Sequence, residues 1–118
     1  MNHKPVEAEF AEHARSELEH AVAAAQRITQ LDGSPDMSPA RLADRSHPEY
    51  RTFDYGDLVG KLKDNLIAER VVTQTYQEII RWLGDGDPTT RCSLERTLGE
   101  EERHAGDLSG LLGAQAES

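Results

Sequence analysis

The first long segment of the chain, residues 5–31, contains no glycine and no proline after its opening residue, and it is rich in alanine, glutamate, arginine and glutamine. These residues favour helices, and Pro5 suits a first helical position. Its apolar residues recur at steps of three, four or seven, which makes one helix face. They are Phe10, Ala14, Ala21, Ala24, Ile28 and Leu31. With a stop at Asp32 and Gly33, the segment predicts a helix roughly 40 Å long.

Two further helices are predicted from the same kind of periodicity, over residues 55–83 and 88–112. Asp54 is the candidate cap of the second helix, and Gly84 is its stop. The pair Asp87-Pro88 is typical of the start of a helix and begins the third one. No segment of the chain has the alternating pattern of a strand, so the sequence predicts an all-α fold.

The connection between the first two helices, residues 33–54, contains three prolines and has no periodicity. A turn between antiparallel helices would need only a few residues. A crossover that runs the length of a helical bundle would need about 20. We therefore expect one domain over residues 1–118, with three long helices, a long crossover and a short helical turn around residues 40–44.

The charge of the chain excludes several classes of partner. It has 22 acidic and 13 basic side chains, a net charge of -9 and a pI near 4.9. Nucleic acids and anionic membranes both attract basic surfaces, so neither is expected as a partner. The single Cys92 excludes an internal disulfide, and no run approaches the ~20 apolar residues of a membrane span. These features predict a cytoplasmic protein.

Carboxylates interrupt the apolar stripes at equivalent positions. Glu17, Glu69 and Glu101 each lie seven residues after one stripe residue and seven before another, and His20 and His104 follow the first and last of them by three. Helical spacing therefore points these five side chains into the bundle. Three neighbouring glutamates are expected to point elsewhere: Glu19, Glu100 and Glu102.

Converging buried carboxylates repel one another, and a divalent cation removes that cost. Mixed carboxylate and imidazole ligands favour iron, with manganese or zinc as alternatives, over calcium or magnesium. The simpler interpretation is that these residues lie on solvated helix faces. What favours a metal site is that both Glu-x-x-His pairs and the intervening glutamate share one phase.

Three segments resemble the ferritin-like superfamily, and within it the bacterioferritin type. SELEHA (16–21), LIAERVVTQTYQEII (66–80) and LGEEERHAGDL (98–108) are similar to its second, third and fourth helices. The resemblance implies a four-helix bundle and a di-iron centre that oxidises Fe(II) in a homo-oligomeric, iron-storing shell.

The resemblance also implies roles for individual residues. Glu17 and Glu101 would be bridging carboxylates, Glu69 a terminal ligand, and His20 and His104 the imidazole ligands. The family has another helix before these three, which supplies one more glutamate. Only sixteen residues precede Glu17, so we expect that first helix to be missing and the centre to be one ligand short.

Other residues and functions stay open at the level of sequence. Leu18 stands where bacterioferritin has a haem-binding methionine, so haem is not expected. His13 is expected at the helix surface, Asn65 either as a partner of a ligand histidine or in a cross-helix hydrogen bond, and Tyr76 in the core. Alternatives to iron storage are a di-iron or di-manganese peroxidase or catalase, and a non-catalytic helical interaction protein.

Overall fold

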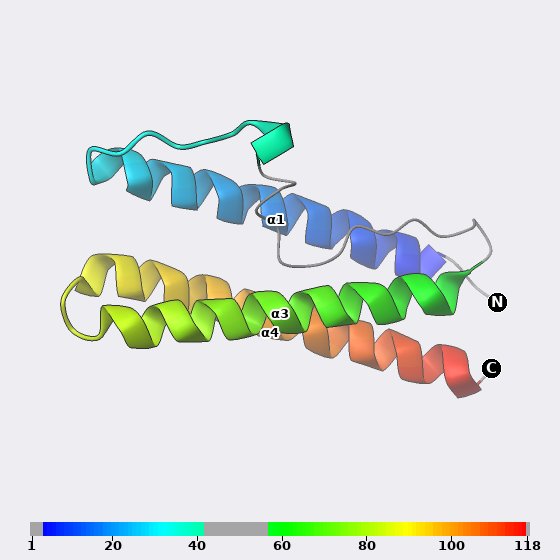
Figure 1. The fold of residues 1–118 in the computed structure, drawn as a ribbon. Coiled ribbons are helices and arrows are strands. Elements are labelled where there is room, and N and C mark those ends of the chain that lie inside the picture. Colours follow the sequence, from blue (N-terminus) through cyan, green and yellow to red (C-terminus); the bar gives the residue numbers. More distant parts are fainter. Residues whose placement is uncertain (1–3, 42–56, 118) are drawn as a thin grey trace.

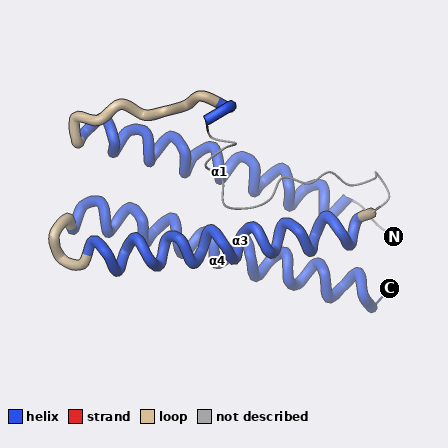
Figure 2. The backbone as a smooth tube through the Cα atoms, in the orientation of Figure 1, coloured by secondary structure: helices blue, strands red, loops and turns tan. Residues whose placement is uncertain are grey.

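The structure of the protein, a computed structural model, describes residues 4–41 and 57–117, which form three long helices. They are α1 (Lys4–Gln30), α3 (Leu58–Leu83) and α4 (Pro88–Glu117). Residues 39–41 are also helical, and the described part of the chain contains no strand (Figure 2). The all-α fold class predicted from the sequence is confirmed. Among the described residues, no helix combines the length and the apolar character needed to span a membrane.

The end of α1 is set by a close backbone turn. Asp32 has a positive φ of 66°, and the N–H of Gly33 donates to the carbonyl oxygen of Ile28 at 2.8 Å. A Cβ at position 33 would lie 2.8 Å from Cγ2 of Ile28, so a larger residue there would have to displace the Ile28 side chain. The helix ends where the Asp32-Gly33 pair predicted.

The start of α3 differs from the prediction. Asp57 is its N-cap, with Oδ1 accepting the N–H of Gly60 at 2.9 Å. Asp54, the predicted cap, lies outside the described residues, and Asp57 takes that role because its carboxylate reaches the third residue of the helix. At the other end, Gly84 has a positive φ of 54° and donates its N–H to Ile80.

The last helix is longer than predicted. Its start agrees with the sequence, because Asp87 accepts the N–H of Thr90 at 3.1 Å and Pro88 is the first helical residue. Its end does not, since α4 continues through Gly113 to Glu117 instead of stopping near Leu112. A helical glycine costs only about 1 kcal/mol, and the alanines and glutamine that follow favour helix.

Figure 1 shows how the three helices are arranged. α1 and α3 begin at the same end of the molecule, and α4 runs in the opposite direction. The short turn after α3 brings α4 back along it, and these two helices pack closely against each other. α1 contacts mainly α4, so α4 is the helix that holds the other two together.

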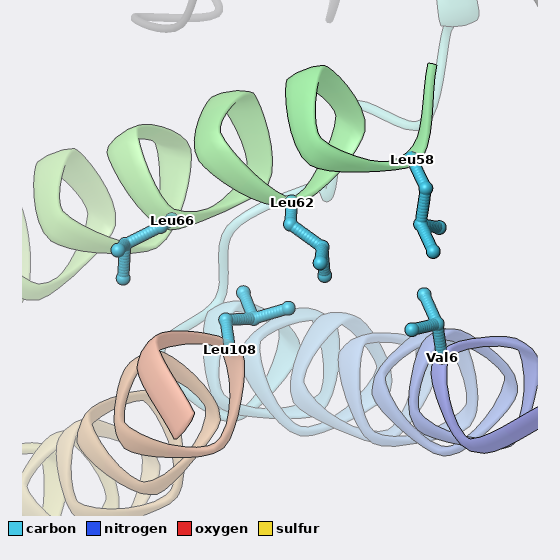
Figure 3. Close-up of a cluster of buried hydrophobic side chains, with 5 residues drawn as sticks. All are labelled: Val6, Leu58, Leu62, Leu66 and Leu108. Carbon is cyan, nitrogen blue, oxygen red and sulfur yellow. The ribbon is translucent and has the colours of Figure 1, made fainter. Parts of the chain in front are cut away.

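The apolar core gathers at one end of the molecule, where α1 and α3 begin. Its fully or nearly fully buried members come from all three helices (Figure 3). They are Val6, Leu58, Leu62, Leu66 and Leu108. Beyond this end, the residues buried between α1 and α4 are polar.

The buried face of α1 is rotated from the predicted one. Its buried residues are Val6, His13, Ser16 and His20. The predicted stripe members Ala14, Ala21 and Ala24 are exposed. Alanine gains little from burial, whereas the two histidines and the serine have partners across the interface. Those partners determine which face of α1 is buried against α4.

Candidate metal centre

Four side chains from the three helices form a compact cluster of oxygen and nitrogen ligands. Glu17 comes from α1 and Glu69 from α3, while Glu101 and His104 come from α4. Each of the four offers one ligand atom, and these atoms lie within 4.8 Å of one another. Glu101 and His104 can both take part because residues three apart share one face of a helix.

His20 joins this cluster from α1. Its Nδ1 lies 2.8 Å from Oε1 of Glu101 and 3.8 Å from Oε1 of Glu17. On the other side, Nδ1 of His104 lies 3.6 Å from Oε2 of Glu101 and 3.5 Å from Oε1 of Glu17. Each of the two carboxylates therefore lies near both imidazoles. All five residues singled out from the sequence meet at this place.

Burial changes the chemistry of the central carboxylate. Glu101 is only 1% exposed. Its burial, followed by the neighbouring carboxyl groups of Glu69 and Glu17, raises the pKa of Glu101 to about 11. In the absence of a cation, Glu101 is therefore a neutral carboxylic acid at neutral pH.

Several buried polar atoms of the cluster have no hydrogen-bond partner among the described residues. They are Oε2 of Glu69, Oε2 of Glu101 and both ring nitrogens of His104. Burial, followed by the nearby His13, also lowers the pKa of His104 and favours the neutral imidazole that can bind a metal. Each unpartnered buried atom costs about 1–3 kcal/mol. A transition-metal ion would satisfy them, so the residues present fit such an ion.

Glu100 does not point away from the site as the sequence predicted. Its Oε2 accepts a hydrogen bond from Nε2 of His20 and another from Oγ of Ser16 at 3.4 Å. The bond from His20 lowers the pKa of Glu100. With Nε2–H donated to Glu100, the Nδ1 lone pair of His20 faces Glu101. A carboxylate that fixes a histidine in this way is the usual support of a metal ligand.

Glu17 differs from the other carboxylates in its exposure. The sequence placed it in the middle of a buried stripe, but its side chain is 46% exposed. The rotation of α1 explains this, because it turns Ser16 toward α4 and Glu17 toward the edge of the interface. The other glutamates predicted to face away, Glu19 and Glu102, are exposed.

His13 is buried, contrary to the surface position expected for it. It is 7% exposed, its ring stacks on that of His104 with centroids 4.0 Å apart, and its Nε2 lies 2.7 Å from Oε1 of Glu9. One ligand atom each from His13, Glu69 and His104 also fall within 4.8 Å of one another. The sequence feature that could have indicated its burial is its position seven residues before His20, which puts both histidines on one helix face.

Asn65 and Tyr76, two further candidates from the sequence, differ in their burial. Asn65 is exposed and donates from Nδ2 to the carbonyl oxygen of Lys61, so it bonds to its own helix and not to a histidine of the site. Tyr76 is half-buried, and its burial, followed by the nearby carboxyl groups of Glu101 and Glu17, raises its pKa.

Long helices around a buried cluster of carboxylates and imidazoles define a helical protein of the ferritin-like class. In agreement, residues 1–116 match the Ferritin family, described as a ferritin-like domain. The chain belongs to this family. Membership places it among iron-binding, ferritin-like proteins.

A solved structure shows the same likeness. The chain is similar to a dodecameric thioferritin, the bacterioferritin-related protein from Bacteroides fragilis, with a TM-score of 0.93 and 33% sequence identity. The match covers 99% of this chain and 70% of that one. No curated protein matches the chain. The absence of a first helix stays a prediction.

Proposed function

We propose that the cluster of Glu17, His20, Glu69, Glu101 and His104 is a ferroxidase centre that binds Fe(II) as substrate and oxidises it for storage or detoxification. The observation that supports this most strongly is the set of buried ligand atoms within 4.8 Å of one another, several of them without a partner among the described residues. When bound, Fe(II) supplies the one-electron chemistry that the side chains lack, with oxygen or hydrogen peroxide as the acceptor.

The side chains have distinct parts in this proposal. Glu17 and Glu101 would be available to ions on either side, because each lies near both His20 and His104. Glu69 completes the ligands on the His104 side. Glu101 also gives up its proton when a cation binds, since its raised pKa keeps it protonated in the free protein.

Rapid mixing of the Fe(II)-loaded protein with oxygen tests the proposal. Formation of Fe(III), followed by absorbance, should be fast in the natural protein and lost in Glu101→Gln. Glutamine has the shape of the protonated glutamate, so this variant keeps the fold. Glu19→Gln, an exposed change on α1, is the matched control and should oxidise Fe(II) normally. Equal rates in the two variants would overturn the assignment.

The products separate iron storage from the alternative chemistries. A storage protein accumulates a ferric mineral as Fe(II) is added, whereas a peroxidase or catalase consumes hydrogen peroxide without a mineral. A purified protein that holds no metal and has the same stability in chelator would favour the non-catalytic interaction protein.

We also propose that the chain assembles with copies of itself. The similar thioferritin is dodecameric. On α1, Leu18 and Val22 are large apolar side chains one helical turn apart, and both are exposed. Ile28 is exposed as well. Light scattering should give a mass well above the 13.1 kDa of one chain, and replacing Leu18 and Val22 by glutamate should reduce it. A compact monomer with a full iron complement would contradict this.

A further inference from the structure

A second group of potential ligands lies one helical turn away from the centre. Glu9 and His13 are one turn apart on α1, and Asp107 is one turn beyond His104 on α4. One ligand atom from each of Glu9, His13 and Asp107 lies within 4.8 Å of the others. The group lies toward the apolar end of the molecule, on the side of the centre opposite to His20.

His13 connects this group with the centre. On one side, its Nε2 lies 2.7 Å from Glu9. On the other, its ring stacks on His104 and it offers a ligand atom within 4.8 Å of ligand atoms from His104 and Glu69. The Oε2 atom of Glu69 and the ring nitrogens of His104 have no hydrogen-bond partner in the described part of the chain. Potential metal ligands are therefore continuous from one group to the other.

An ordinary ion pair explains this group less well. A pair between Glu9 and His13 alone would leave no reason for a second carboxylate, Asp107, beside Glu9. Arg103 does reach Asp107, but only one of its oxygens, at 3.3 Å, and the same Nη1 also contacts Glu12. The carboxyls of Glu9 and Asp107 come from facing helices and offer oxygens within 4.8 Å of each other, a like-charge approach that a bound cation would relieve.

We propose that Glu9, His13 and Asp107 bind a divalent transition-metal ion of their own, separate from the ions of the ferroxidase centre. Two carboxylates and one imidazole suit iron, zinc, manganese or cobalt better than calcium or magnesium. Three protein ligands leave positions for water, and Glu9 and Asp107 are partly exposed. The ion is therefore exchangeable and is bound more weakly than those of the centre. The site does not depend on the oxidation chemistry proposed above.

Zinc binding, measured by equilibrium dialysis of the full chain, tests the proposal. Two classes of site are expected, and Glu9→Gln combined with Asp107→Asn should remove the weaker class or lower its affinity at least about tenfold. His13→Ala should remove it as well. Glu101→Gln should instead lose the tighter class and keep the weaker one. Glu7→Gln and Glu102→Gln, exposed changes on the same two helices, should keep both.

Thermal unfolding with and without zinc gives an independent measure. Replacing Glu9 and Asp107 also changes their pairs with His13 and Arg103, so the Tm of each protein with zinc is compared with its own Tm without zinc. The zinc-induced rise in the Tm of the double variant should be smaller at zinc concentrations that fill the weaker class. If the double variant keeps the natural stoichiometry and the natural rise in Tm, the second site is disproved. If Glu101→Gln changes neither, the ferroxidase centre is disproved while the second site stands.

Discussion

The two interfaces of α4 are built from different chemistry. Against α3, α4 buries aliphatic side chains such as Leu108 beside Leu62. Against α1, apart from the first turns of that helix, it uses polar and charged contacts. These are His20 with Glu100 and Glu101, Arg103 with Glu12, and Arg27 with Thr90 and Asp87.

This difference divides the molecule into a scaffold and a responsive part. Burial of apolar surface depends little on pH or on metal ions. The contacts of α1 with α4 include the ligands themselves, whose protonation and metal binding change the interface directly. The packing of α3 against α4 should therefore depend little on metal ions, whereas the docking of α1 should depend on what occupies the centre.

The largest effect should come from the scaffold. Leu62 is completely buried, and Leu62→Ala removes buried methyl groups and leaves a cavity. We expect the free energy of unfolding to fall by about 2–5 kcal/mol, measured by urea denaturation. Ile67→Ala, on the exposed side of the same helix, is the control and should change it by less than about 0.5 kcal/mol. Similar losses in the two variants would show that the buried contacts of Leu62 do not stabilise the scaffold.

Metal addition should act on the other interface. Zinc at 100 times its dissociation constant stabilises a folded state by about 2.7 kcal/mol. Because α1 contributes Glu17 and His20, we expect hydrogen exchange in α1 to slow on adding zinc, with little change in the first two turns of α3, which lie before the ligand Glu69. In Glu101→Gln this protection should be largely lost. Uniform slowing throughout the chain would mean that α1 and the scaffold unfold together.

Glu100 offers a smaller and more specific test. It fixes His20 through a hydrogen bond without being one of the clustered ligands, and loss of such a partner typically lowers metal affinity about 10–100-fold. Glu100→Gln removes the charge and keeps the size, so we expect about a tenfold loss of zinc affinity with unchanged metal-free stability. Glu102→Gln, exposed on the same helix, should bind zinc normally. A normal affinity in Glu100→Gln would show that the contact does not support the site.

The sequence was a good guide to the centre because helical spacing is local. The offsets of seven and three residues were enough to place Glu69, Glu101 and His104 on inward faces. The same reasoning failed where the result depends on how α1 is rotated about its own axis. That rotation is fixed by contacts with α4, which a stripe of alanines barely specifies.

This rotation explains the individual errors. It buries His13 and Ser16, turns Glu17 to the edge and brings His20 within reach of Glu100. Glu100 could not be placed from its own helix, because its partners are about 80 residues away in the chain. Contacts of this kind become visible only when two helices have been set side by side.

The pH dependence of the metal-free protein gives a last test, whose effect is small for each pH unit. The pKa of Glu101 is raised from 4.5 to about 11 in the folded chain, chiefly by burial and then by Glu69 and Glu17. The folded state therefore holds a proton that the unfolded state releases above about pH 4.5, and stability falls as pH rises toward the folded pKa. His104 acts in the opposite direction, since its pKa is lowered, but its contribution is complete above about pH 7.

Between about pH 7 and pH 9, the loss of stability in chelator-treated protein should thus come mainly from carboxyl groups with a raised pKa, above all Glu101. The free energy of unfolding should fall by less than about 1.4 kcal/mol per pH unit. Urea denaturation should show this slope in the natural protein and a flatter one in Glu101→Gln, which has no proton to lose there. Saturating zinc should reverse the sign, because the ion replaces the proton of Glu101 and binds more tightly as pH rises. Parallel slopes in the two metal-free proteins would show that Glu101 is already ionised without a metal. In that case α1 would be held against α4 by charge pairs and not by a protonated Glu101.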